Sequence, residues 1–343
     1  MTTTRSTPGP GGERRRSFER FGSHVELRVL PPDGHRGHAE QRLDRAELIL
    51  AEFDQRLSRF DPASELCALN ADHRAAVPAS HMMQRFAEAV SWAGRRSGGL
   101  VDATQLDAIE AAGYRDSLAL ADLDAGVLQQ LTVGEGVGRR TGTNQAWRFV
   151  GALGGAVHRP LGVRLDSGGL GKGLAADLAA DALRGATSWL VDCGGDLRLG
   201  GTARRPRPID VRDPLDPERV IHRLHVTSGG VATSGITRRS WGDDHGGSGH
   251  HLIDPRTGRP AATDVLQVTA LAPTALEAEV LAKTALLRGS GEAHAALIHG
   301  GVLVHETGVV EVVAPPRLAQ RDRHAPPRAL FRMPAEATWA VSR

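Results

Sequence analysis

One stretch, residues 163 to 183, constrains the fold of this chain more than any other part of its sequence. It reads VRLDSGGLGKGLAADLAADAL and predicts the end of a strand, a glycine-rich loop and then a helix. Alternating apolar residues favour a strand up to Asp166, four glycines surround Lys172, and Ala and Leu then recur at helical spacing. A glycine loop that leads into a helix leaves backbone N–H groups available to an anion, and the helix dipole adds to the attraction. We therefore predict an anion-binding site at this loop.

The lysine in this loop is unusual for the chain. Of the 42 lysines and arginines, only Lys172 and Lys283 are lysines. A compact ammonium group suits a tight glycine loop in a way that the planar guanidinium group of arginine does not. The ammonium group of Lys172 would then lie beside the anion bound at the glycine loop. Chance placement of one of two lysines is the alternative, and the sequence leaves it open.

The familiar nucleotide-binding motifs do not fit the loop. A Walker A motif has Ser or Thr after its lysine, whereas Gly173 follows Lys172, and its first glycine is replaced by Asp166. The dinucleotide spacing GxGxxG fails as well, because Leu174 occupies the position of the third glycine. The loop therefore indicates a phosphate ligand without indicating either of these nucleotide-binding folds.

Composition limits the class of protein. The 343 residues suit one large domain or two intimately packed ones, and 40% hydrophobic residues support a substantial core. A net charge of +2 with scattered arginines argues against nucleic acid as the main partner. The two cysteines, Cys67 and Cys193, have no metal-binding spacing and form no disulfide framework.

The ends of the chain differ from its middle. Residues 1 to 19 are rich in Pro, Gly and Arg, and we expect a disordered arm there. We expect one domain over residues 20 to 314 and a peripheral Pro/Arg-rich tail over residues 315 to 343. No apolar run approaches the roughly 20 residues of a membrane span, so we expect no membrane insertion and a cytoplasmic location.

Between these ends, short alternating segments are interspersed with amphipathic helices. We expect a strand over residues 21 to 30, a helix over residues 43 to 60, and a helix N-cap at Ser64. Ser80 lies at the start of a second helix. Further strands are expected within residues 147 to 166, 188 to 200 and 210 to 226, followed by a last strand and the helix ALEAEVLAKTALLRG. The pattern therefore predicts both strands and helices in one chain.

Five segments together resemble the ApbE family, the FAD:protein FMN transferases. They are DSGGLGKGLAAD (166 to 177), DCGGD (192 to 196), TSG (233 to 235), HLIDPRTGRP (251 to 260) and EAEVLAKTA (277 to 285). Weaker matches lie upstream, at FGS (from Phe21), SRFDPASELCALN (from Ser58) and GGLVDAT (from Gly98). Order and spacing agree from about residue 20 to 313. The resemblance implies a T-fold-like α+β architecture with mixed or antiparallel sheets and packed helices, one FAD and a magnesium ion.

The resemblance also implies an activity, a partner and a set of site residues. Members of the family cleave FAD, transfer FMN through a phosphoester to a Thr or Ser of an FMN-binding acceptor protein, and release AMP. The positions that match the family's FAD contacts are Phe21, Phe60, Leu100, Val101, Asp102, Asp166, Lys172 and Ile253. The matching catalytic positions are His251 and Lys172. The matching metal positions are the carbonyl of Gly169 and the side chains of Glu279 and Lys283.

Lys283 departs from the family pattern, which has Thr at this position. A protonated lysine cannot coordinate Mg²⁺, so the resemblance leaves the metal in doubt. Glu279 and Lys283 lie four residues apart, which is also the spacing of an ordinary helix salt bridge. Alternatively, the ammonium group stands where the family holds its cation. The sequence therefore keeps two further functions open, an FAD hydrolase that yields FMN and AMP, and a non-catalytic FAD-binding protein.

Overall fold

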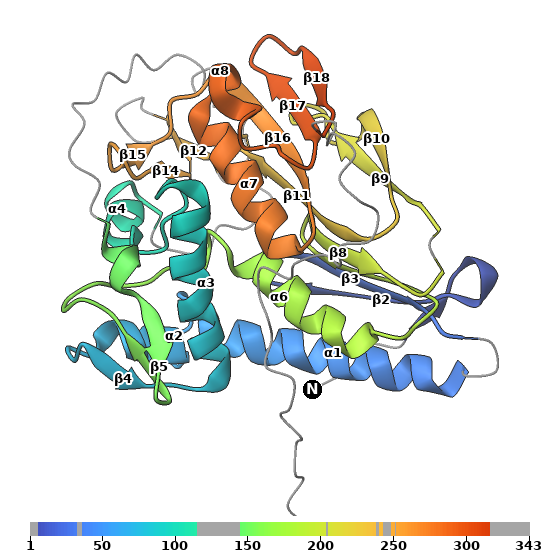
Figure 1. Cartoon of the computed structure of the whole chain (residues 1–343), viewed down its shortest axis with the longest axis horizontal. Coiled ribbons are helices and arrows are strands. Elements are labelled where there is room, and N and C mark those ends of the chain that lie inside the picture. Colours follow the sequence, from blue (N-terminus) through green and yellow to red (C-terminus); the bar gives the residue numbers. More distant parts are fainter. Residues whose placement is uncertain are drawn as a thin grey trace, which may run out of the picture.

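The computed structural model describes residues 6–32, 36–114, 145–203, 205–237, 240–242, 248–250 and 252–315. A sheet of nine strands, antiparallel at every pairing, runs through this part of the chain (Figure 1). In spatial order its strands are β1 (Thr7–Pro8), β2 (Arg14–Arg20), β3 (Ser23–Leu30), β7 (Ser188–Cys193), β8 (Asp196–Gly200), β11 (Gly229–Gly235), β16 (Val265–Ala272), β17 (Gly301–His305) and β18 (Val310–Val313).

Three helices cover one face of this sheet: α1 (Arg36–Leu57), α6 (Gly171–Ala180) and α7 (Ala275–Arg288). Figure 1 shows them side by side, with α6 in the middle and in contact with both neighbours. Apolar strand residues on this face, such as Val191 and Cys193, pack against buried residues of the helices, such as Leu50 and Ala175. The middle helix is thus enclosed by the sheet and by two other helices, which explains its content of Ala and Gly.

A hairpin covers part of the opposite face of the sheet. It consists of β9 (Arg207–Arg212) and β10 (Val220–Val226). Because successive strand residues point to opposite faces, Leu190 and Leu199 turn away from the helices and pack with Val226 of the hairpin. The sheet is therefore buried on both sides at its centre.

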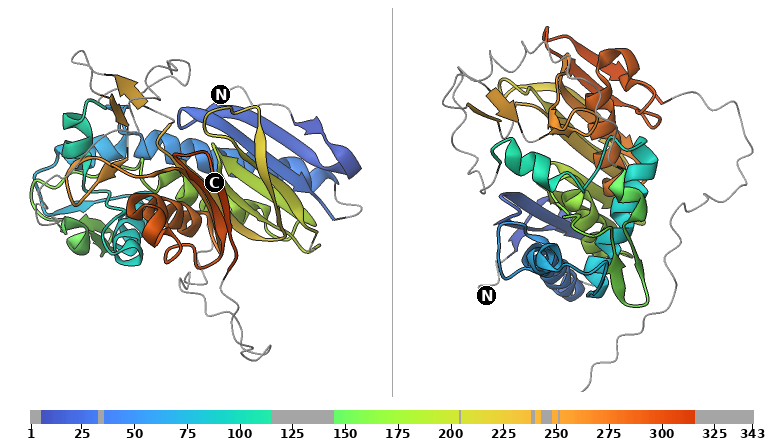
Figure 2. Two further views of the ribbon diagram at one scale, coloured as in Figure 1. Left: turned by 90° about the horizontal axis from the view of Figure 1, so that it is seen from above. Right: turned by 90° about the vertical axis from the view of Figure 1, so that its left-hand side faces the viewer.

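The remaining elements form a smaller region at one end of the molecule. It contains α2 (Glu65–Ala71), α3 (His81–Ser97), α4 (Leu106–Ala111) and a three-stranded sheet of β4 (Ala76–Pro78), β6 (Ala156–His158) and β5 (Gly151–Leu153). Figure 2 shows this sheet at the end of the molecule opposite the β1–β2 hairpin. Short elements complete the described chain: η1 (Pro10–Gly12), η2 (Ala146–Phe149), η3 (Asp181–Leu183), β12 (Ser240–Gly242), β13 (Ser248–His250), β14 (Ile253–Asp254), β15 (Arg259–Pro260) and α8 (Ser290–Ala293).

The predicted α+β class, with antiparallel sheets and packed helices, is confirmed. The predicted helix cap at Ser64 is confirmed as well, and Ser80, predicted at the start of the second helix, is the N-cap of α3. The hydroxyl of Ser64 accepts a hydrogen bond from the N–H of Cys67, and the hydroxyl of Ser80 accepts one from Met83. A side-chain acceptor at the N-cap satisfies an N–H group that the first helical turn leaves without a partner.

The disordered arm predicted over residues 1 to 19 is corrected from residue 7 onward, because β1, η1 and β2 lie there. The arginine-rich strand β2 pairs with β3 along its whole length. Arg16 is only 3% exposed, and its guanidinium group lies 2.7 Å from a carboxylate oxygen of Asp44 and 2.8 Å from one of Glu47, both on α1. The acidic face of α1 thus compensates the charge that suggested disorder. The remaining domain limits stay predictions, and the predicted tail after Pro315 lies outside the described residues.

Two predicted strands also differ from the structure. Residues 163 to 166 are extended but belong to no sheet, because side chains and loops bind their backbone, as described below. The strand predicted from Phe21 begins at Ser23 instead, since Phe21 and Gly22 form the two-residue turn between β2 and β3. Both have φ of 59°, as expected for a type I′ hairpin turn.

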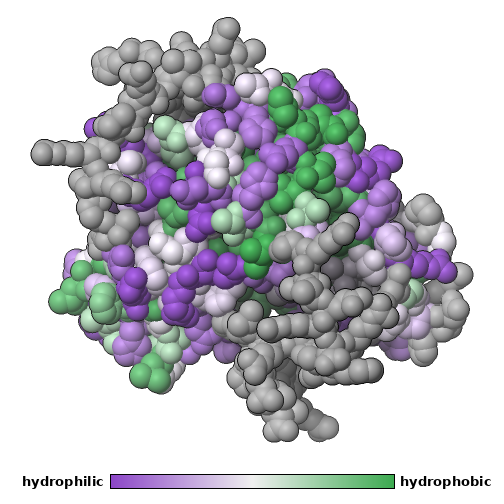
Figure 3. All heavy atoms as spheres, turned by 45° about the horizontal axis from the view of Figure 1, so that its top comes forward, coloured by the Kyte–Doolittle hydropathy of each residue, from purple (hydrophilic) through white to green (hydrophobic). Residues whose placement is uncertain are grey.

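None of the helices in the described part of the chain combines the length and the apolar character that crossing a membrane would require. Figure 3 shows hydrophobic side chains gathered on the side of the molecule where β17 and β18 lie. The edge strand β18 exposes Val310 and Val312, with Glu311 between them. A charged residue on an edge strand disfavours pairing with other chains.

Candidate functional site

A pocket of about 410 Å³ lies where the smaller region meets the helical layer. Its walls come from the β2–β3 turn, the end of α1, the loop before α4, the glycine loop, β14 and α7. Ten of the twelve predicted site residues line it: Phe21, Phe60, Leu100, Val101, Asp102, Asp166, Gly169, Lys172, Ile253 and Lys283. Of the other two, Glu279 lies directly behind Lys283, and His251 lies outside the described residues. The structure thus brings the predicted residues together, and their roles remain predictions.

The glycine loop forms the floor of this pocket and leads directly into α6. The helix begins at Gly171, so Lys172 belongs to its first turn, and the N-cap residue Leu170 provides no side-chain acceptor. The hydroxyl of Ser167 donates to the carbonyl of Leu57 at 2.7 Å, which attaches the loop to the end of α1. The start of α6, with its partial positive charge, therefore faces the pocket together with a lysine.

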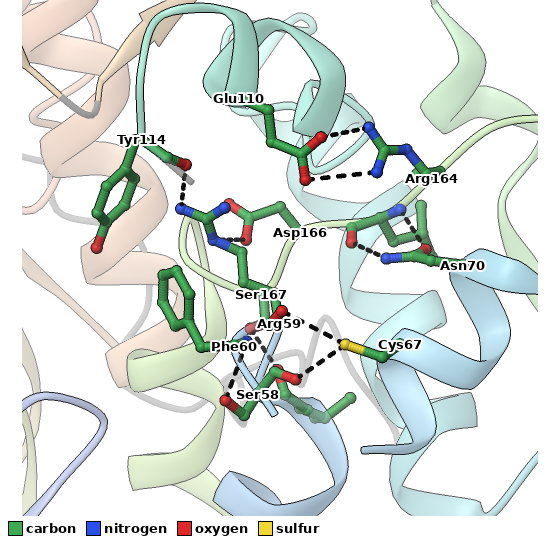
Figure 4. A network of polar contacts seen from close by, with 12 residues as sticks. Ser58, Arg59, Phe60, Cys67, Asn70, Glu110, Tyr114, Arg164, Asp166 and Ser167 are labelled. Carbon is green, nitrogen blue, oxygen red and sulfur yellow. Dashed lines mark hydrogen bonds and ion pairs between the residues drawn. The ribbon is translucent and has the colours of Figure 1, made fainter. Parts of the chain in front are cut away.

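Asn70 holds the extended segment that precedes this loop. Its side-chain amide donates to the carbonyl of Leu165 and accepts from the N–H of the same residue, both at 2.8 Å (Figure 4). The next N–H, that of Asp166, donates to the carbonyl of Ala103 at 2.8 Å. The carboxamide of Asn70 thus replaces the neighbouring strand that the sequence had suggested. The asparagine at the end of the segment SELCALN is therefore explained by its two hydrogen bonds to the backbone of Leu165.

Arg59 is a pocket residue that the sequence analysis missed. Its guanidinium carbon lies 4.2 Å from the centre of the Phe60 ring and 4.4 Å from that of Tyr114, within the range of cation–π attraction. It also donates to the carbonyl of Tyr114 at 3.0 Å, and its Nε lies 3.3 Å from a carboxylate oxygen of Asp166 (Figure 4). Arg59 therefore joins the aromatic wall of the pocket to the glycine loop. The available sequence signal was Tyr114, the single tyrosine of the chain.

Phe21 also lines the pocket, from the turn between β2 and β3, and has a strained backbone conformation. It is the one non-glycine residue with positive φ among the described residues. Its ring meets that of Phe53 edge-on, with centroids 5.9 Å apart. Such outliers persist where the surrounding structure holds them, and they concentrate at ligand-binding sites. This strain supports a role for Phe21 in holding a ligand.

Asp102 and Ile253 are placed by local turns. The carboxylate of Asp102 accepts from the N–H and hydroxyl of Thr104 and from the side chain of Gln105, while burial raises its pKa. Asp254 accepts from the N–H of Arg256, whose guanidinium group binds back to Asp254 and donates to the carbonyl of Leu287. The DPRTGRP turn thus attaches β14, and with it Ile253, to the end of α7.

The histidine next to the predicted catalytic one has a structural role. His250 is 2% exposed, and burial lowers its pKa. Its Nδ1 accepts from the N–H of Leu252, so the proton lies on Nε2, which donates to the carbonyl of Ala261 at 2.9 Å. His250 therefore supports the strand that carries Ile253 and is held as a neutral ring.

Behind the pocket floor, buried carboxylates face the two lysines. Glu279 is 2% exposed, and its Oε1 accepts from the ammonium group of Lys283 at 2.7 Å. Its Oε2 accepts from the N–H of Gly173 in the first turn of α6, at 2.8 Å. Asp196 on β8 is also buried, and burial together with the charge of Glu279 raises its pKa, whereas Lys172 and Lys283 act in the opposite direction. The polar end of the pocket is therefore a cluster of mutually compensating charges.

These contacts do not fit a bound Mg²⁺ ion. Magnesium takes oxygen ligands in octahedral geometry, but each carboxylate oxygen of Glu279 already accepts a hydrogen bond from a nitrogen donor. Lys283 offers only donors at the position where an oxygen ligand is needed. No group of three or more His, Cys, Asp or Glu side chains with metal-binding geometry exists within the described residues. The predicted metal role of Gly169, Glu279 and Lys283 is thus not favoured by the geometry.

Comparison with known proteins agrees with this arrangement. The model of the ApbE family matches residues 21–303. The FAD:protein FMN transferase of Salmonella typhimurium is 36% identical over 120 residues, covering 34% of each chain. The Escherichia coli protein of the same name is 32% identical over 146 residues, covering 41% of each chain. The sequence matches thus span about a third to two fifths of the length of these relatives.

A solved structure matches over a greater length. The crystal structure of the ApbE protein from Thermotoga maritima superposes with a TM-score of 0.70, covering 88% of this chain and 97% of the other at 23% sequence identity. At this identity the match establishes a shared fold. The predicted ApbE-type architecture is therefore confirmed.

Proposed function

The chain belongs to the ApbE family, and we propose that it is an enzyme that transfers FMN from FAD to an acceptor protein. The observation that carries the proposal is the pocket itself, in which the glycine loop, Lys172 and the aromatic wall converge on one space. A ligand with a flat apolar ring system and a pyrophosphate would use both ends of this space. The names of the curated relatives support the same activity.

In this proposal, the pyrophosphate of FAD lies at the start of α6 beside Lys172. A Thr or Ser hydroxyl of the acceptor attacks the phosphorus on the FMN side, a new P–O bond forms, and the bond to the AMP phosphate breaks. AMP leaves with the bridging oxygen, and the hydroxyl proton passes to a base, for which we propose His251. Such reactions depend mainly on positioning and on neutralisation of phosphate charge. Lys172 and the backbone of α6 supply that charge neutralisation.

A second candidate, FAD binding without transfer, is favoured by one observation. Both oxygens of Glu279 accept hydrogen bonds from nitrogen donors, and the ammonium group of Lys283 places a positive charge beside this carboxylate, where a catalytic cation would be repelled. An FAD hydrolase of the same fold, in which water replaces the acceptor hydroxyl, would use the same pocket. The three activities differ in their products and can be separated by one assay.

The test combines the purified protein with FAD and an FMN-binding domain that carries the target Thr. Intact-mass spectrometry of the acceptor detects bound FMN, and chromatography detects AMP. The control acceptor has Val in place of the target Thr. A covalent FMN adduct on the Thr acceptor alone is the expected result. AMP without an adduct would indicate a hydrolase, and FAD binding without either product would indicate a binding protein. Absence of FAD binding at about 100 µM, equivalent to about 5.5 kcal/mol, would exclude all three.

A further inference from the structure

The two lysines of the chain meet in one place. Lys172 and Lys283 come from different helices, α6 and α7, and both line the pocket. Every other basic residue among the 42 is an arginine. An ammonium group is a compact point charge, whereas a guanidinium group is planar and directs its donors in a fixed fork. Convergence of both lysines on one pocket indicates that this pocket requires compact cations.

The contacts of Lys283 hold its charge in a defined position. Its side chain is 11% exposed, and its Nζ donates to Oε1 of Glu279 at 2.7 Å. Glu279 is held in turn by the N–H of Gly173. An ammonium group carries three donors, and Glu279 uses one of them. The ammonium group is thus fixed at the pocket wall by Glu279, which lies about one helical turn before Lys283 on α7.

An ordinary helix salt bridge does not account for this pair. Pairs four residues apart on exposed helix faces contribute only about 0.3–0.5 kcal/mol, and they occur where water solvates both groups. Here the carboxylate is 2% and the lysine 11% exposed, so the desolvation of both groups offsets much of their attraction. A pair placed in the wall of a pocket is therefore better explained by what the pocket binds than by stability.

We propose that Lys283 is a built-in cation of this pocket, whose ammonium group takes the place of a divalent metal so that FAD binds independently of Mg²⁺. The inference rests on the FAD-binding part of the proposed function. A bound pyrophosphate meets two ammonium groups and the start of α6. A divalent ion would have to displace Lys283 from Glu279 and would be repelled by its charge.

The test measures FAD affinity by calorimetry on the full chain, after treatment with a chelator and again with millimolar Mg²⁺. The proteins are wild type, Lys283→Met and Lys283→Thr. We expect the FAD affinity of the wild-type protein to change less than twofold when Mg²⁺ is added. Lys283→Met should lose at least tenfold in affinity under both conditions. Lys283→Thr should lose affinity without Mg²⁺ and recover it with Mg²⁺, because an oxygen ligand then stands beside Glu279.

Two results would overturn the inference: wild-type affinity that rises tenfold or more with Mg²⁺, or Lys283→Met that binds FAD as wild type does. The wild-type comparison needs no variant, so it decides the question even where a substitution impairs folding. Thermal unfolding of each variant identifies such impairment. FMN transfer is measured separately. Mg²⁺-independent FAD binding without transfer would contradict the proposed function alone, and transfer with Mg²⁺-dependent binding would contradict this inference alone.

Discussion

The starts of α6 and α7 lie side by side, and their N–H groups are satisfied in different ways. At the start of α7, Thr274 accepts from the N–H of Glu277, and the carboxylate of Asp177 accepts from the N–H groups of Ala275 and Leu276, both at 2.9 Å. At the start of α6, the N-cap side chain accepts nothing. Its first residues, Gly171 and Lys172, line the pocket, and Glu279 accepts from the N–H of Gly173.

Each helix thus provides an acid to the start of the other. Asp177 on α6 closes the start of α7 completely, whereas Glu279 on α7 reaches α6 two residues past its beginning, behind the pocket floor. An acid at a helix start compensates the positive end of the helix dipole. The closed start is therefore structural, and the open start leaves positive potential for a ligand.

The largest expected effect concerns the open start. Lys172→Ala should weaken FAD binding at least a hundredfold, about 2.8 kcal/mol, because it removes the cation beside the proposed pyrophosphate. Calorimetric titration with FAD measures this loss, and thermal unfolding should change little. Arg223→Ala removes one positive charge from an exposed pair outside the pocket and serves as the matched control. Unchanged affinity, or a loss of stability that parallels the loss of affinity, would contradict the assignment of Lys172.

The next effect concerns the contact between the two helices. A Cβ atom on Gly173 would lie 2.7 Å from the carbonyl oxygen of Ala275 and 2.8 Å from Oε2 of Glu279. We expect Gly173→Ala to lower the free energy of unfolding by about 2 kcal/mol, because overpacking exceeds the gain in helix propensity. Gly169→Ala in the preceding glycine loop, where a Cβ would meet no atom within 4 Å, is the control. Chemical denaturation of both variants makes the comparison, and equal stability would show that the helices can separate at no cost.

A smaller loss is expected at the closed start. Asp177→Ala leaves two N–H groups without their acceptor and removes the partner of Arg198, whose Nε lies 3.1 Å away. We expect a loss of about 1 to 2 kcal/mol in the free energy of unfolding, with FAD affinity unchanged. Asp181→Ala, at the other end of α6 in an exposed pair with Arg184, is the control. If Asp177→Ala instead reduced FAD affinity at full stability, the two helix starts would not differ in role as proposed.

The last effect is a pH dependence at the same residue. Burial raises the pKa of Asp177 to about 6, above its value near 4 in an unfolded chain. Its contribution to stability is therefore fully present below pH 4 and is lost as the pH rises through 6. Asp177→Asn cannot ionise, so its stability relative to wild type should rise by roughly 2 kcal/mol from pH 4 to 7, since the two pKa values differ by about two units. Urea denaturation across this range measures the difference, and a constant difference would show that the carboxylate does not titrate there.

The parts of the fold that the sequence predicted correctly are those whose signals are local. The cap at Ser64 follows from a hydroxyl placed before an apolar helix, and the start of the second helix at Ser80 was read in the same way. Strand β2 could not be predicted in this way, because its arginines are neutralised by Asp44 and Glu47, which are distant in sequence. The extended segment before the glycine loop was assigned to a sheet for a related reason. Its partner is the side chain of Asn70, which leaves no periodic pattern.

The same distinction between local signals and contacts with distant residues applies to the candidate site. Spacing and family resemblance were sufficient to select Lys172, Asp166 and the other pocket residues, because motifs keep their residue types in order along the chain. Arg59 and Asp177 were not recognised, since their roles depend on the rings, carboxylates and N–H groups that surround them. Arginine and aspartate are common in this chain, and nothing in their local sequence distinguishes these two.

What the sequence by itself determined is the family, through it the α+β class, and a glycine-rich loop that leads into a helix, because these depend on short-range periodicity and on motifs read in order. Only the tertiary structure decided that both lysines share one pocket and that Glu279 is already occupied by Lys283 and Gly173. These facts arise where α6 and α7 pack against each other, about a hundred residues apart in the chain. Electrostatic interactions depend on distance and burial in space, and neither can be read from positions along the chain.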